Sequence, residues 1–117
     1  MHNLKELKIW NKAIDLTVDV YKATEKFPKE EVYGLTSQIR RSAVSIPSNI
    51  SEGAGRNSTG EFKHFLGIAN GSSYELQTQV VISQRLSLLE EDTTNELLLK
   101  IEEIQKMNYS FQKTLTK

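Results

Sequence analysis

Residues that could hold a phosphate group are concentrated in the run RRSAVSIPSNISEGAGR, residues 40–56. A dinucleotide-binding loop needs a preceding strand and another glycine three residues after Gly55, where this chain has serine. Gly55 and Gly60 have the spacing of a P-loop, but Glu61 and Phe62 follow where that loop requires lysine and a hydroxyl residue. The sequence therefore argues against nucleotide binding. It predicts instead that the glycines end a helix at a tight turn with positive φ.

Metal-binding and catalytic patterns are equally incomplete. Glu61 and His64 form one Glu-x-x-His pair, whereas a di-iron site in a helical bundle needs two such pairs and two further glutamates. The other histidine, His2, lies in the terminal segment, and the chain has no cysteine. Ser110 and Lys113 match a Ser-x-x-Lys motif, but a match this short arises readily by chance. We therefore expect no metal, no cofactor and no catalytic residue, and we do not expect the protein to be an enzyme.

The length and charge of the chain limit the classes of protein to which it can belong. A chain of 117 residues suits a single domain, which we predict over residues 1–117. Fifteen basic and fifteen acidic residues cancel, so binding to nucleic acid would need a local patch rather than a general positive field. The first sixteen residues place lysines and a glutamate among the apolar residues, unlike a signal peptide or a membrane span. We expect a cytoplasmic protein with no membrane partner.

The chain divides into four segments with apolar residues at three- and four-residue spacing, as in an amphipathic helix. These four expected helices must position any functional side chains. The first expected face contains Leu7, Trp10, Ala13, Thr17, Val20, Thr24 and Phe27, broadened by Ile9, Leu16 and Tyr21. The second contains Leu35, Ile39, Ala43, Ile46, Ile50 and Ala54. The third contains Phe62, Phe65, Leu66, Ala69, Ser73, Leu76, Val80 and Ser83. The fourth contains Leu97, Ile101, Ile104, Asn108, Phe111 and Leu115.

Local signals predict where these helices begin and end. Asn3 is expected to start the first, and Phe27–Pro28 to end it, because the residue before a proline is pushed out of the helical region. The second is expected to open after Gly34. The runs at residues 58–61 and 93–96 have the pattern of capping boxes and should start the third and fourth helices.

Four such helices with short connections predict an all-α, antiparallel up-down-up-down four-helix bundle. Further apolar residues lie off the four faces and exceed what one small bundle can bury, so we expect part of this surplus to contact another subunit. The surplus residues are Ile14, Val18, Val44, Ile68, Val81, Ile82, Leu88, Leu98 and Leu99.

Pro47 lies inside the second predicted helix. It has no N–H to give to the carbonyl group of Ala43, a defect that usually costs about 3 kcal/mol or more. The apolar face nevertheless keeps its phase from Ile39 to Ala54. We therefore predict a continuous helix with a kink between Ala43 and Pro47, where a hydroxyl of Ser42 or Ser45, or a water molecule, serves the freed carbonyl.

Polar residues follow one another at helical spacing on the second and third helices. On the second helix they include Arg41, Glu52 and Arg56, and on the third Ser72 and Glu75. One interpretation is that such residues are ordinary surface positions that contribute little to stability. The other is that they form a network between helices or subunits, or line a site for an anionic partner.

A resemblance to a known family is carried by the run QIRRSAVSIPSNISEG, residues 38–53, with Arg56 following. Further agreement lies at residues 7–13, 27–28, 31–35, 65–72 and 75–76. Together these segments resemble the four-helix-bundle family first noticed as open reading frames within intervening sequences of bacterial 23S ribosomal RNA genes.

This resemblance implies a homopentamer with no catalytic activity. The family is similar to the accessory variability determinant of diversity-generating retroelements, a basic pentamer that associates with a reverse transcriptase and with nucleic acid. The net charge of zero sets this chain apart from that relative. The residues that match the signature, and that we predict to contact a partner or another subunit, are Arg40, Arg41, Asn49, Glu52, Gly53, Arg56, Ser72 and Glu75.

Two functional hypotheses follow. In the first, the protein is a non-enzymatic, oligomeric adaptor whose polar face on the second helix engages structured RNA or an RNA-associated protein. In the alternative, the same residues only fasten subunits together and no nucleic acid is bound.

Overall fold

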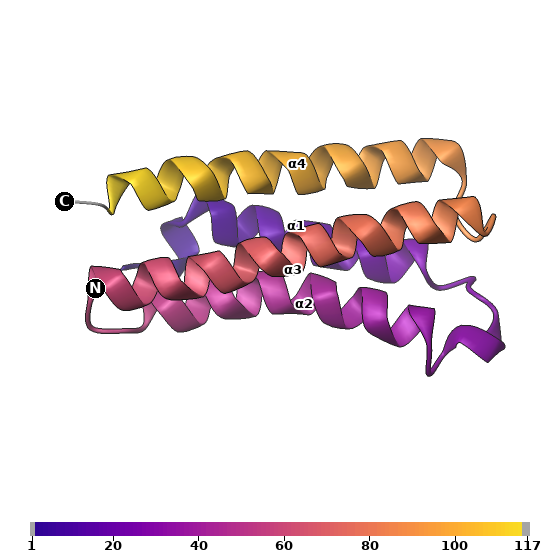
Figure 1. Cartoon of the computed structure of the whole chain (residues 1–117), viewed down its shortest axis with the longest axis horizontal. Helices are drawn as coiled ribbons and strands as arrows, with labels where there is room; N and C mark the ends of the chain where they lie inside the picture. The colour runs from indigo at the N-terminus through magenta and orange to yellow at the C-terminus, as the bar shows by residue number, and fades with distance from the viewer. Residues whose placement is uncertain (1, 116–117) are drawn as a thin grey trace.

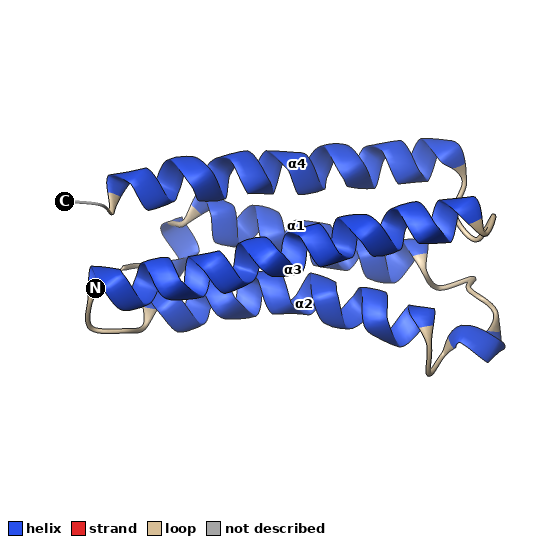
Figure 2. Ribbon diagram, viewed as in Figure 1, coloured by secondary structure: helices blue, strands red, loops and turns tan. Residues whose placement is uncertain are grey.

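The chain folds into helices, which Figure 1 shows in chain order and Figure 2 by secondary structure. The computed structural model describes residues 2–115. Its elements are two short 3-10 helices, η1 (Leu4–Glu6) and η2 (Lys29–Glu31), and four long helices, α1 (Lys8–Ala23), α2 (Leu35–Ala54), α3 (Thr59–Arg85) and α4 (Glu91–Thr114). Residues 2–115 contain no strand, so the predicted all-α class is confirmed. The domain predicted over residues 1–117 also includes Met1 and residues 116–117, which lie outside the described residues.

The four long helices lie along the longest axis of the molecule, as Figure 1 shows. The described part of the chain measures 46 × 24 × 21 Å. α1 packs against α2 and α4, and α3 also packs against α2 and α4, so every long helix has two neighbours. The apolar faces meet in one interior. Its largest fully buried apolar residues are Phe62, Leu16, Ile39, Ile46, Ile50, Leu66, Leu76, Ile101, Ile104, Val20 and Val80.

Most residues of the predicted apolar faces of α2, α3 and α4 are buried, while Leu35, Phe65, Phe111 and Leu115 are partly buried. On α1 the buried residues are Ile9, Ala13, Leu16 and Val20, while Tyr21, which was expected to broaden the face, is exposed. The exposed ring of Tyr21 contacts the guanidinium group of Arg40 from α2.

The predicted end of α1 at Phe27–Pro28 is wrong by four residues, since α1 ends at Ala23. The hydroxyl of Thr24 donates to the carbonyl oxygen of Val20 at 2.9 Å and serves one of the last carbonyl groups of the helix. Phe27 remains part of the core beyond the end of the helix.

The first predicted capping box forms in part, because Ser58 caps the helix while the Glu61 carboxylate reaches the Ser58 hydroxyl rather than its backbone N–H. Ser58 caps α3, where its Oγ accepts from the backbone N–H of Glu61 at 3.1 Å and donates to the Glu61 carboxylate at 3.2 Å. The second box is wrong, because α4 begins at Glu91 and the run 93–96 lies within its first turns. There the hydroxyl of Thr94 donates back to the carbonyl oxygen of Glu90 at 2.8 Å. Hydrogen bonding within the helix thus replaces the expected cap.

α2 passes through Pro47 without a break, as predicted from the phase of its apolar face. The prediction that a hydroxyl of Ser42 or Ser45 serves the carbonyl group of Ala43 is wrong, because the observed hydroxyl comes from α1. The hydroxyl of Thr17, on α1, lies 3.0 Å from the Ala43 carbonyl oxygen and 2.8 Å from that of Ala13. The single hydroxyl proton of Thr17 is shared between these two acceptors, so the neighbouring helix offers the Ala43 carbonyl group a hydrogen bond in place of the one that the proline cannot give.

Most of the surplus apolar residues lie at the surface, as their positions off the helix faces suggested. The exposed ones are Ile14, Val18, Val44, Ile68, Ile82 and Leu99, while Val81, Leu88 and Leu98 are partly buried. None of the helices in the described part of the chain is both long and apolar enough to cross a lipid bilayer.

The ion pair between Lys100 of α4 and Asp19 of α1 joins two helices far apart in sequence. The hydrogen bond to Asp19 raises the pKa of Lys100 above its ordinary value of 10.5, against a smaller opposing effect of burial. Because the pKa of Lys100 is higher in the folded than in the unfolded protein, its charge stabilises the folded state at pH values below 10.5. This stabilisation is lost as the pH rises through the pKa of the folded state.

We expect Lys100→Met to lower the free energy of unfolding by less than about 1 kcal/mol at pH 7, because the pair is partly exposed and screened by water. The difference from wild type should shrink above pH 10.5. Urea unfolding of both proteins at neutral and alkaline pH measures the difference in their free energies of unfolding. A difference that grows with pH would show that the ion pair does not raise the pKa of Lys100.

Candidate functional site

The candidate site residues lie on α2, on α3 and in the turn between them, and the structure divides them into three groups. Some bind α1 or the α2–α3 turn, some connect α2 to α3, and two have no partner.

Arg40 is half-buried and points to α1. Its Nε donates to Thr24 Oγ1 at 2.9 Å and its Nη2 to the carbonyl oxygen of Tyr21 at 3.3 Å. The guanidinium carbon lies 4.6 Å from the centre of the Tyr21 ring, a cation–π distance. Arg40 therefore stabilises the end of α1 and is not available as a free cation.

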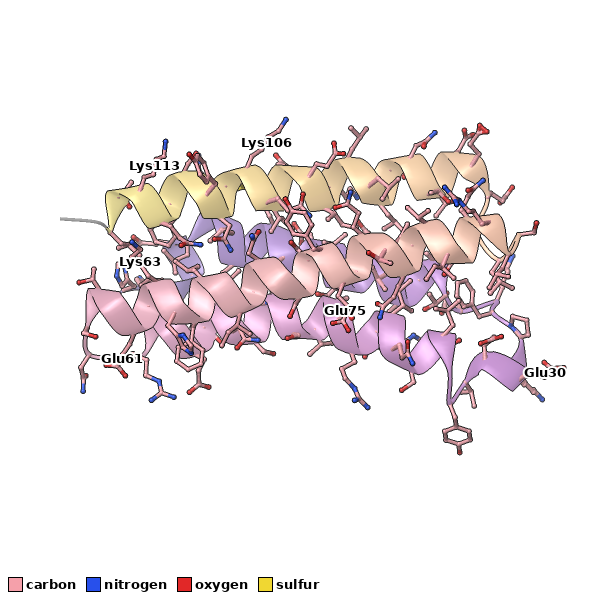
Figure 3. The ribbon with its side chains drawn as sticks, in the orientation of Figure 1. Glu30, Glu61, Lys63, Glu75, Lys106 and Lys113 are labelled. Atoms are coloured by element: carbon pink, nitrogen blue, oxygen red, sulfur yellow. The ribbon has the colours of Figure 1, made fainter. Side chains whose placement is uncertain are left out.

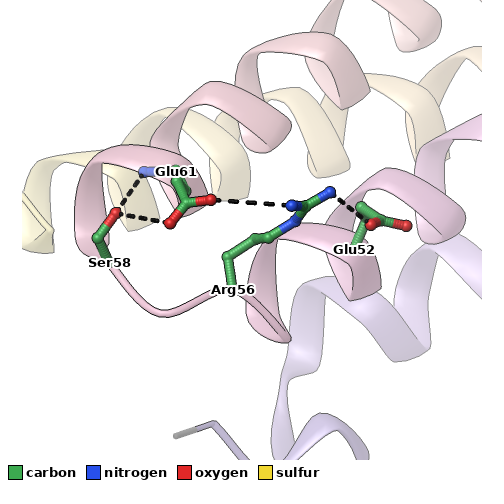
Figure 4. Close-up of polar contacts among 4 residues, drawn as sticks. All are labelled: Glu52, Arg56, Ser58 and Glu61. Carbon is green, nitrogen blue, oxygen red and sulfur yellow. Dashed lines mark hydrogen bonds and ion pairs between the residues drawn. The ribbon is translucent and has the colours of Figure 1, made fainter.

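Arg56 follows the end of α2 and joins the two sides of the α2–α3 turn, as Figure 4 shows. Its Nη2 donates to Glu52 Oε2 at 2.8 Å, and its Nη1 lies 3.8 Å from Glu61 Oε2. The guanidinium carbon also lies 4.8 Å from the centre of the Phe65 ring. Glu61 in turn contacts Ser58, the cap of α3. Two carboxylates thus neutralise this arginine within its own chain.

Asn49 and Ser72 belong to a hydrogen-bonded chain between α2 and α3. Asn49 Nδ2 donates to the backbone oxygen of Ser45 at 2.8 Å and to its Oγ at 2.9 Å. Ser45 Oγ and Ser72 Oγ are 2.9 Å apart. These half-buried groups satisfy one another across the contact of the two helices, as buried polar groups must.

Gly53 of α2 is buried against Phe62 and Phe65 of α3. A Cβ atom at this position would lie 2.8 Å from Phe62 Cδ1, 2.8 Å from Phe65 Cβ and 3.2 Å from the backbone oxygen of Phe62. The prediction that glycine ends this helix is confirmed at Gly55, but the predicted positive φ is wrong, because no glycine of residues 2–115 has one. Gly53 is required for the space it leaves, and Gly55 ends α2 at φ −85°.

Arg41 of α2 and Glu75 of α3 are exposed. Unlike the other charged signature residues, neither forms a hydrogen bond or an ion pair with any residue within 2–115. Figure 3 shows Glu75 projecting from α3 on the side away from α4. These two opposite charges are the signature side chains still free to bind another molecule.

His64, the histidine of the Glu-x-x-His pair, is exposed and has its ring 5.4 Å from that of Phe65. Within the described range, no group of three or more histidine, cysteine, aspartate or glutamate side chains could hold a metal ion.

Sequence reasoning missed Thr17 as the donor to Ala43. Proline inside a helix signals that a carbonyl group needs a donor, but the donor lies 26 positions away in the chain. Only the packing of α1 on α2 identifies it. The sequence identifies Ser45 as a polar residue of α2. That it pairs with Ser72 is known only from the contact of α2 with α3.

These features define a class, an all-α protein of four long helices whose signature polar residues largely bind its own neighbouring helices. The family described as 23S rRNA-intervening sequence protein matches residues 5–110, and the chain belongs to that family. The resemblance found in the sequence is thereby confirmed, while the similarity to the accessory variability determinant stays a prediction.

A solved structure with the same fold is the crystal structure of a protein of unknown function from the S23 ribosomal protein family of Bacteroides thetaiotaomicron. It has a TM-score of 0.81 and 23% sequence identity, and the match covers 90% of this chain and 98% of that chain. A comparison with curated proteins finds no match.

Proposed function

We propose that the chain is a non-enzymatic homo-oligomer that acts as an adaptor for structured RNA or an RNA-associated protein. The observation that carries this proposal is the pair Arg41 and Glu75, two exposed, opposite charges without a partner among the described residues. Every other charged signature residue already has a partner within the chain.

The assembly we propose is a pentamer, and the resemblance to the family is its basis. The exposed apolar residues of α1 and α2, Ile14, Val18 and Val44, support a subunit contact, because a lone small domain gains nothing from exposing them. We further propose that the helices run in antiparallel up-down-up-down order and that α2 is kinked near Pro47. Short connections and the contacts of each helix with two neighbours support this order.

We place the protein in the cytoplasm. Because its net charge is zero, affinity for RNA must come from a local contact. Arg41 is the arginine of the signature that could supply such a contact, since Arg40 and Arg56 already serve their own chain. In the alternative function, Arg41 and Glu75 pair between copies, and the protein binds no nucleic acid.

The test is the single substitution Arg41→Ala. Replacing Arg40 or Arg56 would also remove hydrogen bonds within the chain, so a loss of RNA binding in those variants could not be assigned to a lost RNA contact. We expect Arg41→Ala to weaken binding of a labelled structured RNA at physiological salt several-fold, because one phosphate contact is lost. Light scattering should give an unchanged mass. Arg85→Ala is the matched control, since Arg85 is an exposed arginine at the end of α3 outside the signature.

Other outcomes separate the two functions. If Arg41→Ala and Glu75→Ala both lower the mass of the oligomer and wild type binds no RNA, the alternative is correct. If wild type binds no RNA and both variants keep the mass of wild type, the proposed role of this charge pair is overturned.

A further inference from the structure

A groove of about 600 Å³ runs between α3 and α4, and none of the residues that line it is one of the candidate site residues described above. Its volume lies within the range of small-molecule and cofactor sites. The side chains that line it include Tyr74 of α3 and Glu102, Lys106 and Tyr109 of α4. A groove with this lining offers flat aromatic surface, a cation and an anion to the same ligand.

The two tyrosines provide the flat surface. Tyr74 is 55% exposed and Tyr109 is 65% exposed, although the rings of phenylalanine and tryptophan in this chain are buried or partly buried. Neither tyrosine hydroxyl has a hydrogen-bond partner within residues 2–115. Exposed rings beside an open groove are the surfaces on which single-stranded nucleic acids stack their bases.

Two lysines stand beside these rings. Lys106 lines the groove, and the Nζ of Lys113 lies 4.5 Å from the centre of the Tyr109 ring. Figure 3 shows both lysines pointing outward from α4. Neither forms an ion pair with a carboxylate in the described part of the chain. Two cations without a carboxylate partner, one of them against a stacking surface, can contact the phosphates that flank a stacked base.

Glu102 adds a discriminating group, because its carboxylate is exposed and has no ion-pair partner among the described side chains. A carboxylate accepts hydrogen bonds from the exocyclic amino group of cytosine, whereas uracil presents a carbonyl oxygen at that position. The groove should therefore prefer cytosine-rich RNA to uracil-rich RNA.

We propose that the α3–α4 groove binds single-stranded RNA, with bases stacked on Tyr74 and Tyr109 and phosphates contacted by Lys106 and Lys113. The inference rests on the RNA function proposed above but assigns the contact with unpaired bases to a different face. A folded RNA could then contact Arg41 through its backbone and this groove through a loop.

The experiment titrates wild type and variants into a labelled cytosine-rich single-stranded RNA of about ten nucleotides, measured by fluorescence anisotropy. We expect Tyr109→Ala to bind about 5- to 150-fold more weakly, which corresponds to a stacking contribution of about 1–3 kcal/mol. Tyr109→Phe should bind like wild type, because the phenyl ring still stacks. Tyr33→Ala is the matched control, since Tyr33 is 96% exposed and lies outside the groove.

The dependence on salt tests the lysines separately. If Lys106 contacts one phosphate, Lys106→Ala should reduce the slope of log K against log salt by about 0.7. A uracil-rich RNA of the same length should bind wild type more weakly, and Glu102→Gln should narrow that difference.

The outcomes distinguish this proposal from the function on which it rests. If Tyr109→Ala and Tyr74→Ala both bind like wild type while Arg41→Ala loses affinity for structured RNA, the groove assignment is wrong and the proposed function stands. If only the groove variants lose affinity, the groove is the RNA site and the role of Arg41 is wrong. If wild type binds neither RNA, both proposals fail. Tyrosine-dependent binding of a proline-rich peptide in the absence of RNA binding would identify a peptide groove and overturn the RNA assignment.

Discussion

Replacing Thr17 with valine is expected to lower the free energy of unfolding by about 1–3 kcal/mol, the usual cost of a buried polar group left without a partner. Valine keeps the shape of threonine but removes the hydroxyl that reaches the carbonyl oxygen of Ala43 at 3.0 Å. Ala43 is fully buried, and Pro47 has no N–H to take over. Urea unfolding of the variant and wild type measures the loss.

Thr78→Val is the control for this substitution. The hydroxyl of Thr78 on α3 donates only to the carbonyl oxygen of Tyr74, one turn earlier, and the residue is exposed. Its loss should change stability by less than about 0.5 kcal/mol, as for most surface positions. Equal effects of Thr17→Val and Thr78→Val would show that the contact with Ala43 contributes nothing.

The same contact predicts a coupling between Thr17 and Pro47. In the Pro47→Ala variant, the new backbone N–H can bond to the carbonyl oxygen of Ala43 within α2. Thr17→Val should therefore cost less in this background than in wild type, by about 0.5–3 kcal/mol in a double-mutant cycle. Additive effects of the two substitutions would contradict the proposed repair of α2 by α1.

Gly53→Ala is expected to destabilise the protein even though alanine favours helix. Alanine inside a helix gains about 1 kcal/mol over glycine. Its Cβ, however, would lie 2.8 Å from Phe65 Cβ, an atom attached directly to the backbone, so α2 and α3 must move apart. Overpacking of this kind costs about 1–3 kcal/mol. We therefore expect a net loss of up to about 2 kcal/mol in urea unfolding.

The same substitution at Gly67 or Gly71 of α3 should have the opposite sign. At both positions an added Cβ has nothing within 4 Å, so only the gain in helix propensity, up to about 1 kcal/mol, remains. If Gly53→Ala proved as stabilising as Gly67→Ala, the close approach of α2 and α3 would not depend on this glycine.

Much of the fold could be predicted from periodicity. Most of the residues on the apolar faces of α2, α3 and α4 were identified, because a residue's place on a helix follows from its position in the chain. The helix ends were less accurate. The run 93–96 has the residues of a capping box, but α4 begins earlier, at Glu91, and Thr94 bonds back to Glu90. A pattern of four residues cannot decide whether a threonine hydroxyl accepts from a backbone N–H as a cap or donates to the carbonyl group one turn earlier, because the two bonds have similar strength.

For the candidate site, the sequence predicted which residues belong to it but not what they contact. The sequence identified the signature residues as a group, but it could not assign partners to them. Arg40 and Arg41 are adjacent in the chain, yet Arg40 binds Thr24 and Tyr21 of α1 while Arg41 remains without a partner within residues 2–115. Adjacent residues of a helix point about 100° apart, so the position of the neighbouring helix decides which of them it contacts.

By itself, then, the sequence determined the helical class, the family and the continuity of α2 through Pro47, because these depend on spacing along one chain. Only the tertiary structure decided that Thr17 serves the carbonyl group freed by the proline, and that Gly53 is needed for close packing rather than for a turn. Both facts depend on distances between helices that are remote in sequence, and those distances are fixed only when the apolar faces pack together.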